Sequence, residues 1–309
     1  MMRHLLSIDD LPAEELAGIV RRSARYALDE RPARPGPLTG AVAGIYFRRT
    51  STRTRTAFTV AALRLGADVI AFGPHDLQEN TGESTSDTGR VLSSFLDVFV
   101  ARTADAPAEL RTMADQDTMA VINAMTSDEH PTQAIADLST LQTLRGGLDG
   151  VRVCYIGEGN NTAAALALAL ARVPGARLHL VTPPGYGVPT ETVAAAVRAS
   201  AATGARITES HDPAELPDDA DVLYTTRWQT TGTVKADPDW RTVFEPFRVT
   251  GEVMKRVPDA VFMHDLPAHR GEEVDAEVLD GERSVAFTQA RHKLFSAMAV
   301  LEWAVAGAE

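Results

Sequence analysis

Cysteine is almost absent from this 309-residue chain, which has a single one, Cys154. One thiol cannot form an intramolecular disulfide, and its setting, Val-Arg-Val-Cys-Tyr-Ile, predicts a buried strand in which the thiol is inert. Long apolar runs are lacking as well. None approaches the roughly 20 residues that span a bilayer, and the first residues hold no apolar signal-peptide segment. We therefore expect a cytoplasmic protein without membrane association.

Positive charge is also scarce. The chain has 30 Lys and Arg against 42 Asp and Glu, a net charge of −12, which argues against a nucleic-acid-binding surface. Any anion site must then be a local concentration of arginine. The length suits two domains of about 150 residues, each able to bury its own core.

The hydrophobic pattern alternates between helix and strand along both halves of the chain. In the first half we predict helices at 12–30, 53–65, 86–95, 106–115 and 131–144, and strands at 41–47, 67–72, 97–101 and 119–122. After a glycine-rich turn at 145–150 we predict strands at 151–156, 177–181, 205–208, 221–225 and 260–263, and helices at 160–172, 190–202 and 288–306. Such alternation predicts an α/β fold of two doubly wound parallel-sheet (Rossmann-like) domains joined by long helices.

Residues 47–55, Phe-Arg-Arg-Thr-Ser-Thr-Arg-Thr-Arg, gather hydroxyls and guanidiniums where a predicted strand gives way to a helix. Ser51 and Thr52 fall at the helix start. Unpaired backbone N–H groups and partial positive charge at a helix N-terminus bind anions, and arginine adds charge-assisted hydrogen bonds. An ordinary capped helix with solvated arginines is the alternative, because Ser and Thr are common N-caps.

Two further segments fall at corresponding positions. Arg102 follows the strand at 97–101, and His130 and Gln133 flank the start of another helix, where Pro131 is tolerated. Each alone is compatible with a loop arginine or a simple cap. Ligands of open α/β sheets lie beyond the carboxyl ends of the strands, so we expect these side chains to form one anion pocket. The predicted pocket comprises Ser51, Thr52, Arg53, Thr54, Arg102, His130 and Gln133.

Three strings resemble the aspartate/ornithine carbamoyltransferase family, nearer to the ornithine type. They are Ser-Thr-Arg-Thr-Arg at 51–55, His-Pro-Thr-Gln at 130–133 and His-Asp-Leu-Pro-Ala-His-Arg-Gly-Glu-Glu-Val at 264–274. The resemblance implies that the pocket binds carbamoyl phosphate. It assigns His130 and Gln133 to the carbonyl oxygen and amide, Arg102 to the phosphate and carbonyl oxygens, and the backbone carbonyl of Leu266 to the carbamoyl amide.

Within that family, carbamoyl phosphate donates its carbamoyl group to an amine. Because the donor is already activated, the enzyme needs only to orient the amine and to stabilise the oxyanion and the leaving phosphate. We assign catalytic roles to Arg53, Arg102, His130 and Asp265, and expect no metal and no cofactor. The resemblance places carbamoyl phosphate in a domain of residues 1–145 plus a returning helix at about 288–309, and the acceptor in a domain of residues 146–287.

The turn at 157–162, Gly-Glu-Gly-Asn-Asn-Thr, invites a dinucleotide-binding interpretation because it follows a strand and opens a helix. That fingerprint requires a third glycine where Thr162 stands, and an acid at the end of the next strand, which is missing. The turn is similar to the Gly-Asp-Gly-Asn-Asn turn of ornithine carbamoyltransferases. This similarity implies that Asn161 binds the acceptor.

The acceptor motifs depart from the ornithine pattern. Asp265 replaces a cysteine, and its carboxylate would pair with a cationic amine or take a proton from it. Thr226 replaces an acid that holds the α-amino group of ornithine, whereas Arg227 and Gln229 resemble residues of the aspartate enzyme that hold a carboxylate. We expect ornithine or a related diamino acid as acceptor, in arginine biosynthesis or specialised metabolism. Aspartate, or a non-catalytic homologue, is the alternative.

Two remaining segments bear on assembly and charge. Residues 80–90 resemble a loop that a neighbouring subunit inserts into the active site, which assigns Thr81 and Glu83 to that loop, although Thr81 replaces a lysine of the aspartate enzyme. The resemblance therefore implies a homotrimer or a multiple of it. Residues 289–295 shift positive charge to Arg291 and Lys293 relative to the family pattern, and we add Lys293 to the carbamoyl phosphate set.

Overall fold

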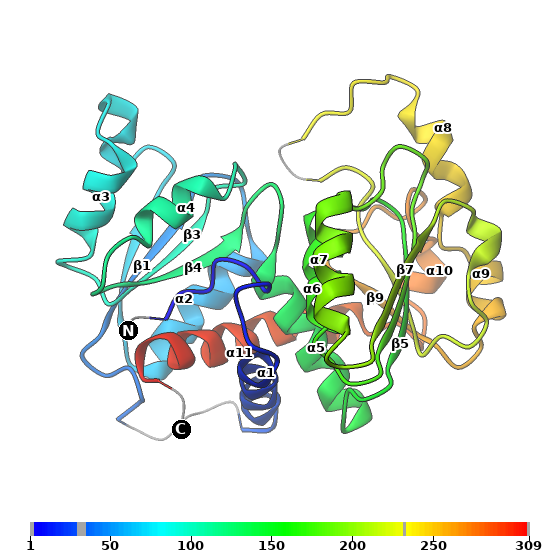
Figure 1. The fold of residues 1–309 in the computed structure, drawn as a ribbon, viewed down its shortest axis with the longest axis horizontal. Coiled ribbons are helices and arrows are strands. Elements are labelled where there is room, and N and C mark those ends of the chain that lie inside the picture. Colours follow the sequence, from blue (N-terminus) through cyan, green and yellow to red (C-terminus); the bar gives the residue numbers. More distant parts are fainter. Residues whose placement is uncertain (1–2, 30–34, 231–232, 308–309) are drawn as a thin grey trace. The chain divides into compact units, whose positions relative to one another are not determined.

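The computed structural model describes residues 3–29, 35–230 and 233–307. The chain forms two compact units (Figure 1). Unit 1 contains Met1–Thr143 and Arg291–Glu309, and unit 2 contains Leu144–Ala290. Both points of division fall inside helices, namely α5 (Pro131–Arg145) and α11 (Ala286–Val305).

Unit 1 is built on a parallel sheet with the strand order β2-β1-β3-β4. Its strands are β1 (Val42–Phe47), β2 (Asp68–Phe72), β3 (Val98–Arg102) and β4 (Ala120–Met125). Its helices besides α5 and α11 are α1 (Ala13–Leu28), α2 (Arg53–Leu65), the 3-10 turn η1 (Gln78–Thr81), α3 (Thr85–Leu92) and α4 (Ala108–Met113). The sheet order reverses direction at β1, as in doubly wound folds, so ligand-binding positions are expected next to β1 and β3.

Side chains alternate between the two faces of this sheet. Tyr46 and Phe99 stack on the face that α3 and α4 cover, where Leu110 and Met113 of α4 join the same buried cluster. The helices α1 and α11 of unit 1 are in contact, since the Tyr26 hydroxyl of α1 donates to Glu302 of α11 at 2.7 Å. Unit 1 is therefore a parallel sheet with helices packed against it.

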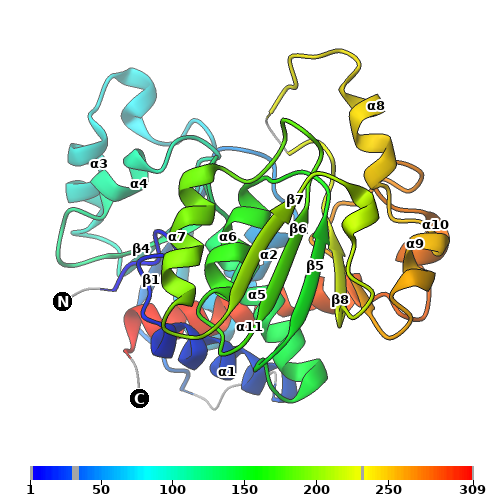
Figure 2. The same cartoon turned by 45° about the vertical axis from the view of Figure 1, so that its right-hand side comes forward.

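Unit 2 repeats the plan with the parallel strand order β7-β6-β5-β8-β9. Its strands are β5 (Arg152–Ile156), β6 (Arg177–Val181), β7 (Arg206–Ser210), β8 (Val222–Thr225) and β9 (Val261–His264). Its helical segments are α6 (Asn161–Leu170), α7 (Thr190–Ser200), η2 (Pro213–Glu215), α8 (Trp240–Phe244), η3 (Glu245–Phe247), α9 (Gly251–Arg256) and α10 (Ala276–Leu279). Figure 2 shows α6 and α7 together along the strands β5, β6 and β7.

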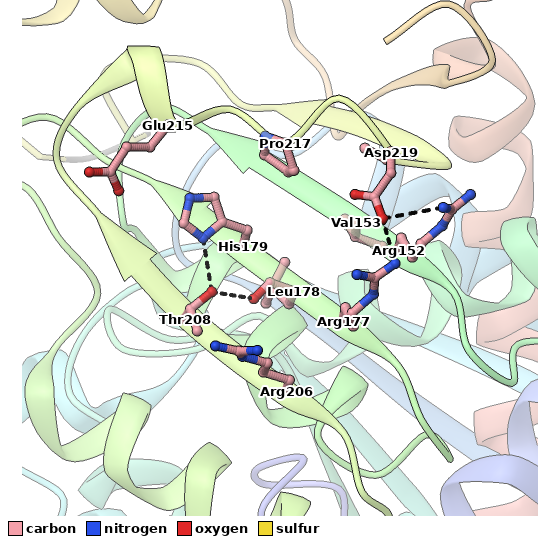
Figure 3. Close-up of a pocket in the computed structure, with 11 residues that line it drawn as sticks. Arg152, Val153, Arg177, Leu178, His179, Arg206, Thr208, Glu215, Pro217 and Asp219 are labelled. Atoms are coloured by element: carbon pink, nitrogen blue, oxygen red, sulfur yellow. Dashed lines mark hydrogen bonds and ion pairs between the residues drawn. The ribbon is translucent and has the colours of Figure 1, made fainter.

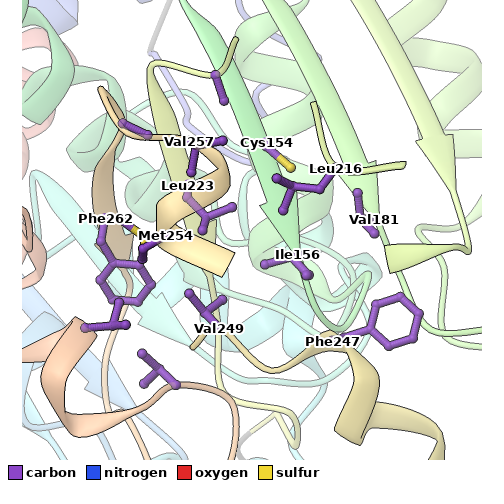
Figure 4. Packing of buried hydrophobic residues seen from close by; sticks show 14 of the residues in the cluster. Cys154, Ile156, Val181, Leu216, Leu223, Phe247, Val249, Met254, Val257 and Phe262 are labelled. Carbon is purple, nitrogen blue, oxygen red and sulfur yellow. The ribbon is translucent and has the colours of Figure 1, made fainter. Parts of the chain in front are cut away.

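The face of this sheet that includes Cys154 and Ile156 packs against a buried apolar cluster (Figure 4). Phe262 of β9 and Met254 of α9 belong to it, together with Phe247 from η3. Burial raises the pKa of the Cys154 thiol to about 12. The thiol is thus a neutral core group, as its sequence context predicts.

The α/β class and the two doubly wound parallel sheets are confirmed. Each predicted strand is found within a few residues of its expected bounds, since short apolar runs flanked by turn residues mark strands clearly. The short segments η1, η2, α8, η3, α9 and α10 were not predicted, because three to six residues are too few to show a helical period. Among the described residues, no helix is long and apolar enough to cross a membrane.

Candidate functional site

The start of α2 lies at the carboxyl end of β1, and its N-terminal N–H groups are not capped by the expected side chain. Thr52 occupies the N-cap position, is exposed and makes no side-chain capping hydrogen bond. Arg102, the last residue of β3, donates from Nη1 to Ser51 Oγ at 3.3 Å. Arg53 begins α2, and Thr54 is buried in its first turn. The predicted hydroxyls and the Arg102 guanidinium thus come from the ends of two neighbouring strands.

His130 precedes α5 and is buried, with 5% of its surface exposed. Burial, followed by the positive charges of Lys293 and Arg102, lowers the pKa of His130 well below its ordinary value. The imidazole is therefore neutral at physiological pH, and its Nδ1 lies 3.3 Å from Thr132 Oγ1. A neutral ring next to two cations acts as a hydrogen-bond donor or acceptor rather than as a third positive charge.

Gln133 in the first turn of α5 is held from both ends of its amide. Its Nε2 donates to Asp137 Oδ1 at 2.7 Å, and its Oε1 accepts a hydrogen bond from Lys293 Nζ of α11. Lys293 is 7% exposed and Asp137 is fully buried. Asp137 was not predicted as a site residue, although a spacing of four residues from Gln133 on a helix places the two side chains on one face.

Unit 1 therefore brings together Ser51, Arg102, His130, Gln133 and Lys293 through hydrogen bonds and the electrostatic effects just described. Two cationic side chains and a neutral histidine next to a helix start are a combination that suits a bound anion.

The segment that includes Thr81 and Glu83 makes contacts of its own. Thr81 Oγ1 donates to the Gln78 carbonyl at 2.7 Å, and Glu83 accepts a hydrogen bond from Thr88 Oγ1 at 2.6 Å. Both predicted residues are exposed. Their side chains thus order η1 and the start of α3 within one chain.

In unit 2 the turn between β5 and α6 is fixed by Asn160 and by a close backbone approach. The Asn160 side chain caps α6 by accepting from Thr162 N and Ala163 N. A Cβ on Gly159 would lie 2.2 Å from Val188 N and 2.3 Å from the carbonyl carbon of Gly187. The second glycine of the turn is thus required by the chain's own backbone. Asn161, the predicted acceptor residue, begins α6 and is buried.

Asp265 follows β9 and is oriented by two threonines. Thr162 Oγ1 donates to Oδ2 and Thr226 Oγ1 donates to Oδ1, each at 2.9 Å. Thr226 follows β8, and the register pairs the preceding residues, Thr225 and His264, across the two parallel strands. The two predicted residues Thr226 and Asp265 are therefore direct neighbours at the carboxyl edge of the sheet.

A buried network behind Asp265 supports Leu266. His264 Nδ1 accepts from Leu266 N at 2.8 Å, and its Nε2 lies 3.2 Å from Glu273 Oε1, which also accepts from His269 N at 2.5 Å. This network places the ring proton of neutral His264 on Nε2. Leu266 adopts a φ of 53°, unusual for a residue with a side chain, and the network holds it there.

Arg227 and Gln229 lie on the segment after β8. Arg227 is half-buried, and its Nε is buried without a hydrogen-bond partner among the described residues. Gln229 donates from Nε2 to the Thr233 carbonyl at 2.8 Å. The glutamine amide thus helps to shape its own loop, whereas the buried Nε of the arginine makes no hydrogen bond within the described residues.

The same segment ends in an aromatic cage that was not predicted from the sequence. Lys235 Nζ forms an ion pair with Glu158 and lies 4.7, 5.2 and 4.8 Å from the ring centroids of Tyr186, Trp240 and Phe244. Thr230 Oγ1 donates to the second oxygen of Glu158 at 3.1 Å. These contacts tie the segment after β8 to the turn after β5.

A cavity of about 230 Å³ lies at the opposite, amino-terminal edge of the unit 2 sheet (Figure 3). Arg152, Arg177 and Arg206 line it and face one another in register across β5, β6 and β7. Asp219 pairs with Arg177 at 2.6 Å and with Arg152 at 3.4 Å, which offsets their repulsion. None of the predicted site residues lines this cavity.

Comparison with known proteins gives the family. Residues 3–143 match the aspartate/ornithine carbamoyltransferase carbamoyl-P binding domain, and residues 149–304 match the Asp/Orn binding domain of the same family. The chain is 40% identical to an ornithine carbamoyltransferase of a Parafrankia species over 304 residues, 97% of this chain and 95% of the relative. It is 36% identical to the anabolic ornithine carbamoyltransferase of Pyrococcus furiosus, over 99% of this chain and 97% of that one.

Solved structures agree with the sequence comparison. The ornithine carbamoyltransferase from Pyrococcus furiosus superposes with a TM-score of 0.91 at 35% identity, covering 99% of this chain and 98% of the other. The enzyme from Gloeobacter violaceus gives a TM-score of 0.86 at 34% identity, covering 100% and 99%. The chain therefore belongs to the aspartate/ornithine carbamoyltransferase family, nearer to its ornithine type, as its motifs predict.

Proposed function

We propose that this protein transfers the carbamoyl group of carbamoyl phosphate to an amine of ornithine or a related diamino acid, releasing phosphate. The observation that carries the proposal is the cluster of Arg102, Lys293 and neutral His130 beside the uncapped start of α2. That cluster suits a small anion with a carbonyl group. The ornithine carbamoyltransferases among the relatives support ornithine as the acceptor.

In the proposed reaction, the neutral acceptor nitrogen attacks the carbonyl carbon of carbamoyl phosphate. A C–N bond forms, the C–O bond to phosphate breaks, phosphate leaves with the electron pair, and the nitrogen loses a proton. Ser51, Thr52, Arg53 and Thr54 bind the phosphate, where Arg53 stabilises the charge of the leaving group. Arg102 and His130 donate to the carbonyl oxygen as it gains negative charge, and Gln133 and Lys293 complete the donor set.

The acceptor site of the proposal lies in unit 2. Arg227 binds the acceptor carboxylate, because its guanidinium follows β8 directly after Thr226, and a guanidinium suits a carboxylate. Asn161, Thr226, Gln229 and Asp265 complete the acceptor set. Leu266 offers its carbonyl to the carbamoyl amide while its N–H is occupied by His264. Accordingly we assign carbamoyl phosphate to a domain of residues 1–145 plus 288–309, and the acceptor to a domain of residues 146–287.

Aspartate is the second candidate acceptor, and Arg227 is the observation that favours it. A guanidinium suits an acceptor that carries a carboxylate, which is true of both aspartate and diamino acids. Aspartate has a second carboxylate, however, and Asp265 at the same sheet edge would repel it. We therefore rank aspartate below diamino acids.

We also propose a homotrimer, or a multiple of it, in which residues around Thr81 and Glu83 reach a neighbouring active site. Exposed apolar side chains on unit 1, Ile70, Val91 and Phe95, support association through this unit. A cytoplasmic location completes the proposal. Light scattering coupled to size exclusion tests the assembly, and a monomer at micromolar concentration would contradict it.

Phosphate release tests the proposed activity. The protein is mixed with carbamoyl phosphate and, in turn, ornithine, shorter diamino acids, aspartate or no amine. We expect amine-dependent release that is lost in Arg53→Ala and retained in Arg64→Ala, a change at the other end of the same helix. If none of the amines caused phosphate release while carbamoyl phosphate still bound, the protein would be a non-catalytic homologue.

A further inference from the structure

The carboxylates of Glu158, after β5, and Asp265, after β9, both lie at the carboxyl edge of the unit 2 sheet, and of these two only Glu158 forms an ion pair with a lysine or arginine among the described residues. Glu158, after β5, pairs with Lys235, whose side chain is 5% exposed and surrounded by the rings of Tyr186, Trp240 and Phe244. A desolvated cation between aromatic faces is strongly held. Glu158 is therefore already occupied and does not need a ligand cation.

Asp265 has the opposite environment. Its side chain is 15% exposed, and its hydrogen bonds come from the neutral hydroxyls of Thr162 and Thr226. His264 Nδ1 lies 3.4 Å from Oδ1, but that nitrogen accepts the Leu266 N–H, so the neutral ring adds no positive charge there. Among the residues that the structure describes, no lysine or arginine forms an ion pair with Asp265.

The two hydroxyls also fix the direction of this charge. They come from the start of α6 and the end of β8, whereas Asp265 follows β9, so three separate segments converge on one carboxylate. Each oxygen retains a lone-pair site after accepting one threonine hydrogen bond. A half-buried, oriented and uncompensated carboxylate is the recognition site expected for an ammonium group.

We propose, building on the proposed carbamoyl transfer, that Asp265 binds the acceptor amine that is not carbamoylated, in its protonated form. The acceptor must then carry two amines and a carboxylate, so the substrate class is the diamino acids. Thr162 and Thr226 act as positioning residues that aim the carboxylate. Asp265 is thus a specificity-determining residue, and selection by charge takes place at position 265 rather than at Glu158.

The inference is tested with a pair of acceptors that differ only in the second amine. Ornithine has it, and 5-aminovalerate keeps the carbon chain and the carboxylate without it. Rates of carbamoyl transfer to both are measured for the wild type, Asp265→Asn and Glu158→Gln. Asn retains the shape of Asp and can still bond to both threonines, and circular dichroism verifies that each variant is folded.

We expect Asp265→Asn to lower kcat/KM for ornithine about 10- to 100-fold, in line with hydrogen bonds to charged groups, and to leave 5-aminovalerate within about threefold. Glu158→Gln is expected to change both acceptors by the same factor, because Glu158 shapes the loop without binding the amine. The Thr226→Val variant should reproduce part of the selectivity loss, which keeps the test informative if Asp265→Asn fails to fold.

Two outcomes would overturn the inference in distinguishable ways. An equal loss with ornithine and 5-aminovalerate in Asp265→Asn would identify a general base or a structural residue, while the proposed function would stand. If the wild type transferred no carbamoyl group to ornithine or to shorter diamino acids, the proposed function would fail and the inference with it.

Discussion

The carboxyl group of Glu129 should make the stability of unit 1 depend on pH around neutrality. This residue precedes His130 and is 8% exposed. Ser7 Oγ donates to its Oε2 at 2.5 Å and Ile8 N donates to its Oε1 at 2.7 Å, which ties the N-terminal segment to the end of β4. Burial, aided by the charges of Asp10 and Asp9, raises the pKa of Glu129 to about 7 despite those hydrogen bonds.

The sign and size of the effect follow from linkage between protonation and folding. The ordinary pKa is 4.5, so the folded state binds the proton more tightly than the unfolded state. The contribution to stability is complete below about pH 4.5 and is lost as the pH rises through about 7. With 1.36 kcal/mol per pKa unit, the wild type should lose about 2.5 kcal/mol of unfolding free energy from this group between pH 5 and pH 8.

Glu129→Gln removes the titration while its amide oxygen can still accept the Ile8 N–H. The difference in unfolding free energy between variant and wild type should therefore shift by about 2.5 kcal/mol in favour of the variant from pH 5 to pH 8. Urea unfolding is followed by Trp303 fluorescence in a background where Trp228 and Trp240 are phenylalanine, so that the signal reports unit 1. Parallel stability curves for the two proteins across this range would refute the reasoning.

Three further predictions concern unit 2. Lys235→Met should lower the unfolding free energy of unit 2 by about 3 kcal/mol, because Glu158 keeps a partly buried charge without its partner. Adding Glu158→Gln should restore part of the lost free energy. Urea unfolding followed by tryptophan fluorescence measures the stability of both variants, and additive losses would contradict the pairing. Cys154, whose thiol pKa is raised to about 12 by burial, should react with a thiol reagent only on unfolding, and rapid labelling of the native protein would count against its burial. Gly159→Ala must displace the backbone at Val188, so the KM for the acceptor should rise about tenfold while the KM for carbamoyl phosphate stays unchanged. Steady-state kinetics measures both constants, and an unchanged KM for the acceptor would show that the turn accommodates the extra methyl group.

The two sheets and the carbamoyl phosphate motifs at 51–55 and 130–133 could be predicted from the sequence because each depends on residues that are close together in the chain. A buried strand of five residues followed by an amphipathic helix can be recognised from the hydrophobic pattern of about 20 residues. The start of α2 is such a case, since the hydroxyl-rich segment from Ser51 lies where the predicted strand and helix meet. Arg102 and His130 were placed at the same edge by the general rule that parallel strands present their carboxyl ends together.

The aromatic cage of Lys235 had no comparable local signal. Its members come from the turn after β5, the loop after β6, the loop after β8 and the helix α8, which is too short to show a period. Nothing in the sequence near Lys235 distinguishes it from a solvated lysine of a polar loop. Only the close approach of four segments turns it into a buried cation, and that approach depends on tertiary packing.

Asp265 shows how register adds chemistry that the motifs alone leave open. From the sequence, the Asp265 carboxylate had two possible roles, as a partner of an ammonium group or as a base. Thr226, which stands where the ornithine pattern has an acid, is 39 positions away in the chain. Parallel pairing of β8 and β9 makes them neighbours, and the threonine hydroxyl donates to the aspartate at 2.9 Å. The charge absent from the end of β8 is present at the end of β9, about one strand spacing of 4.8 Å away. In the proposed complex, an ammonium group bound to Asp265 would lie next to Leu266, whose carbonyl we assign to the carbamoyl group, and the carbon chain of a diamino acid would separate that ammonium group from the reacting amine.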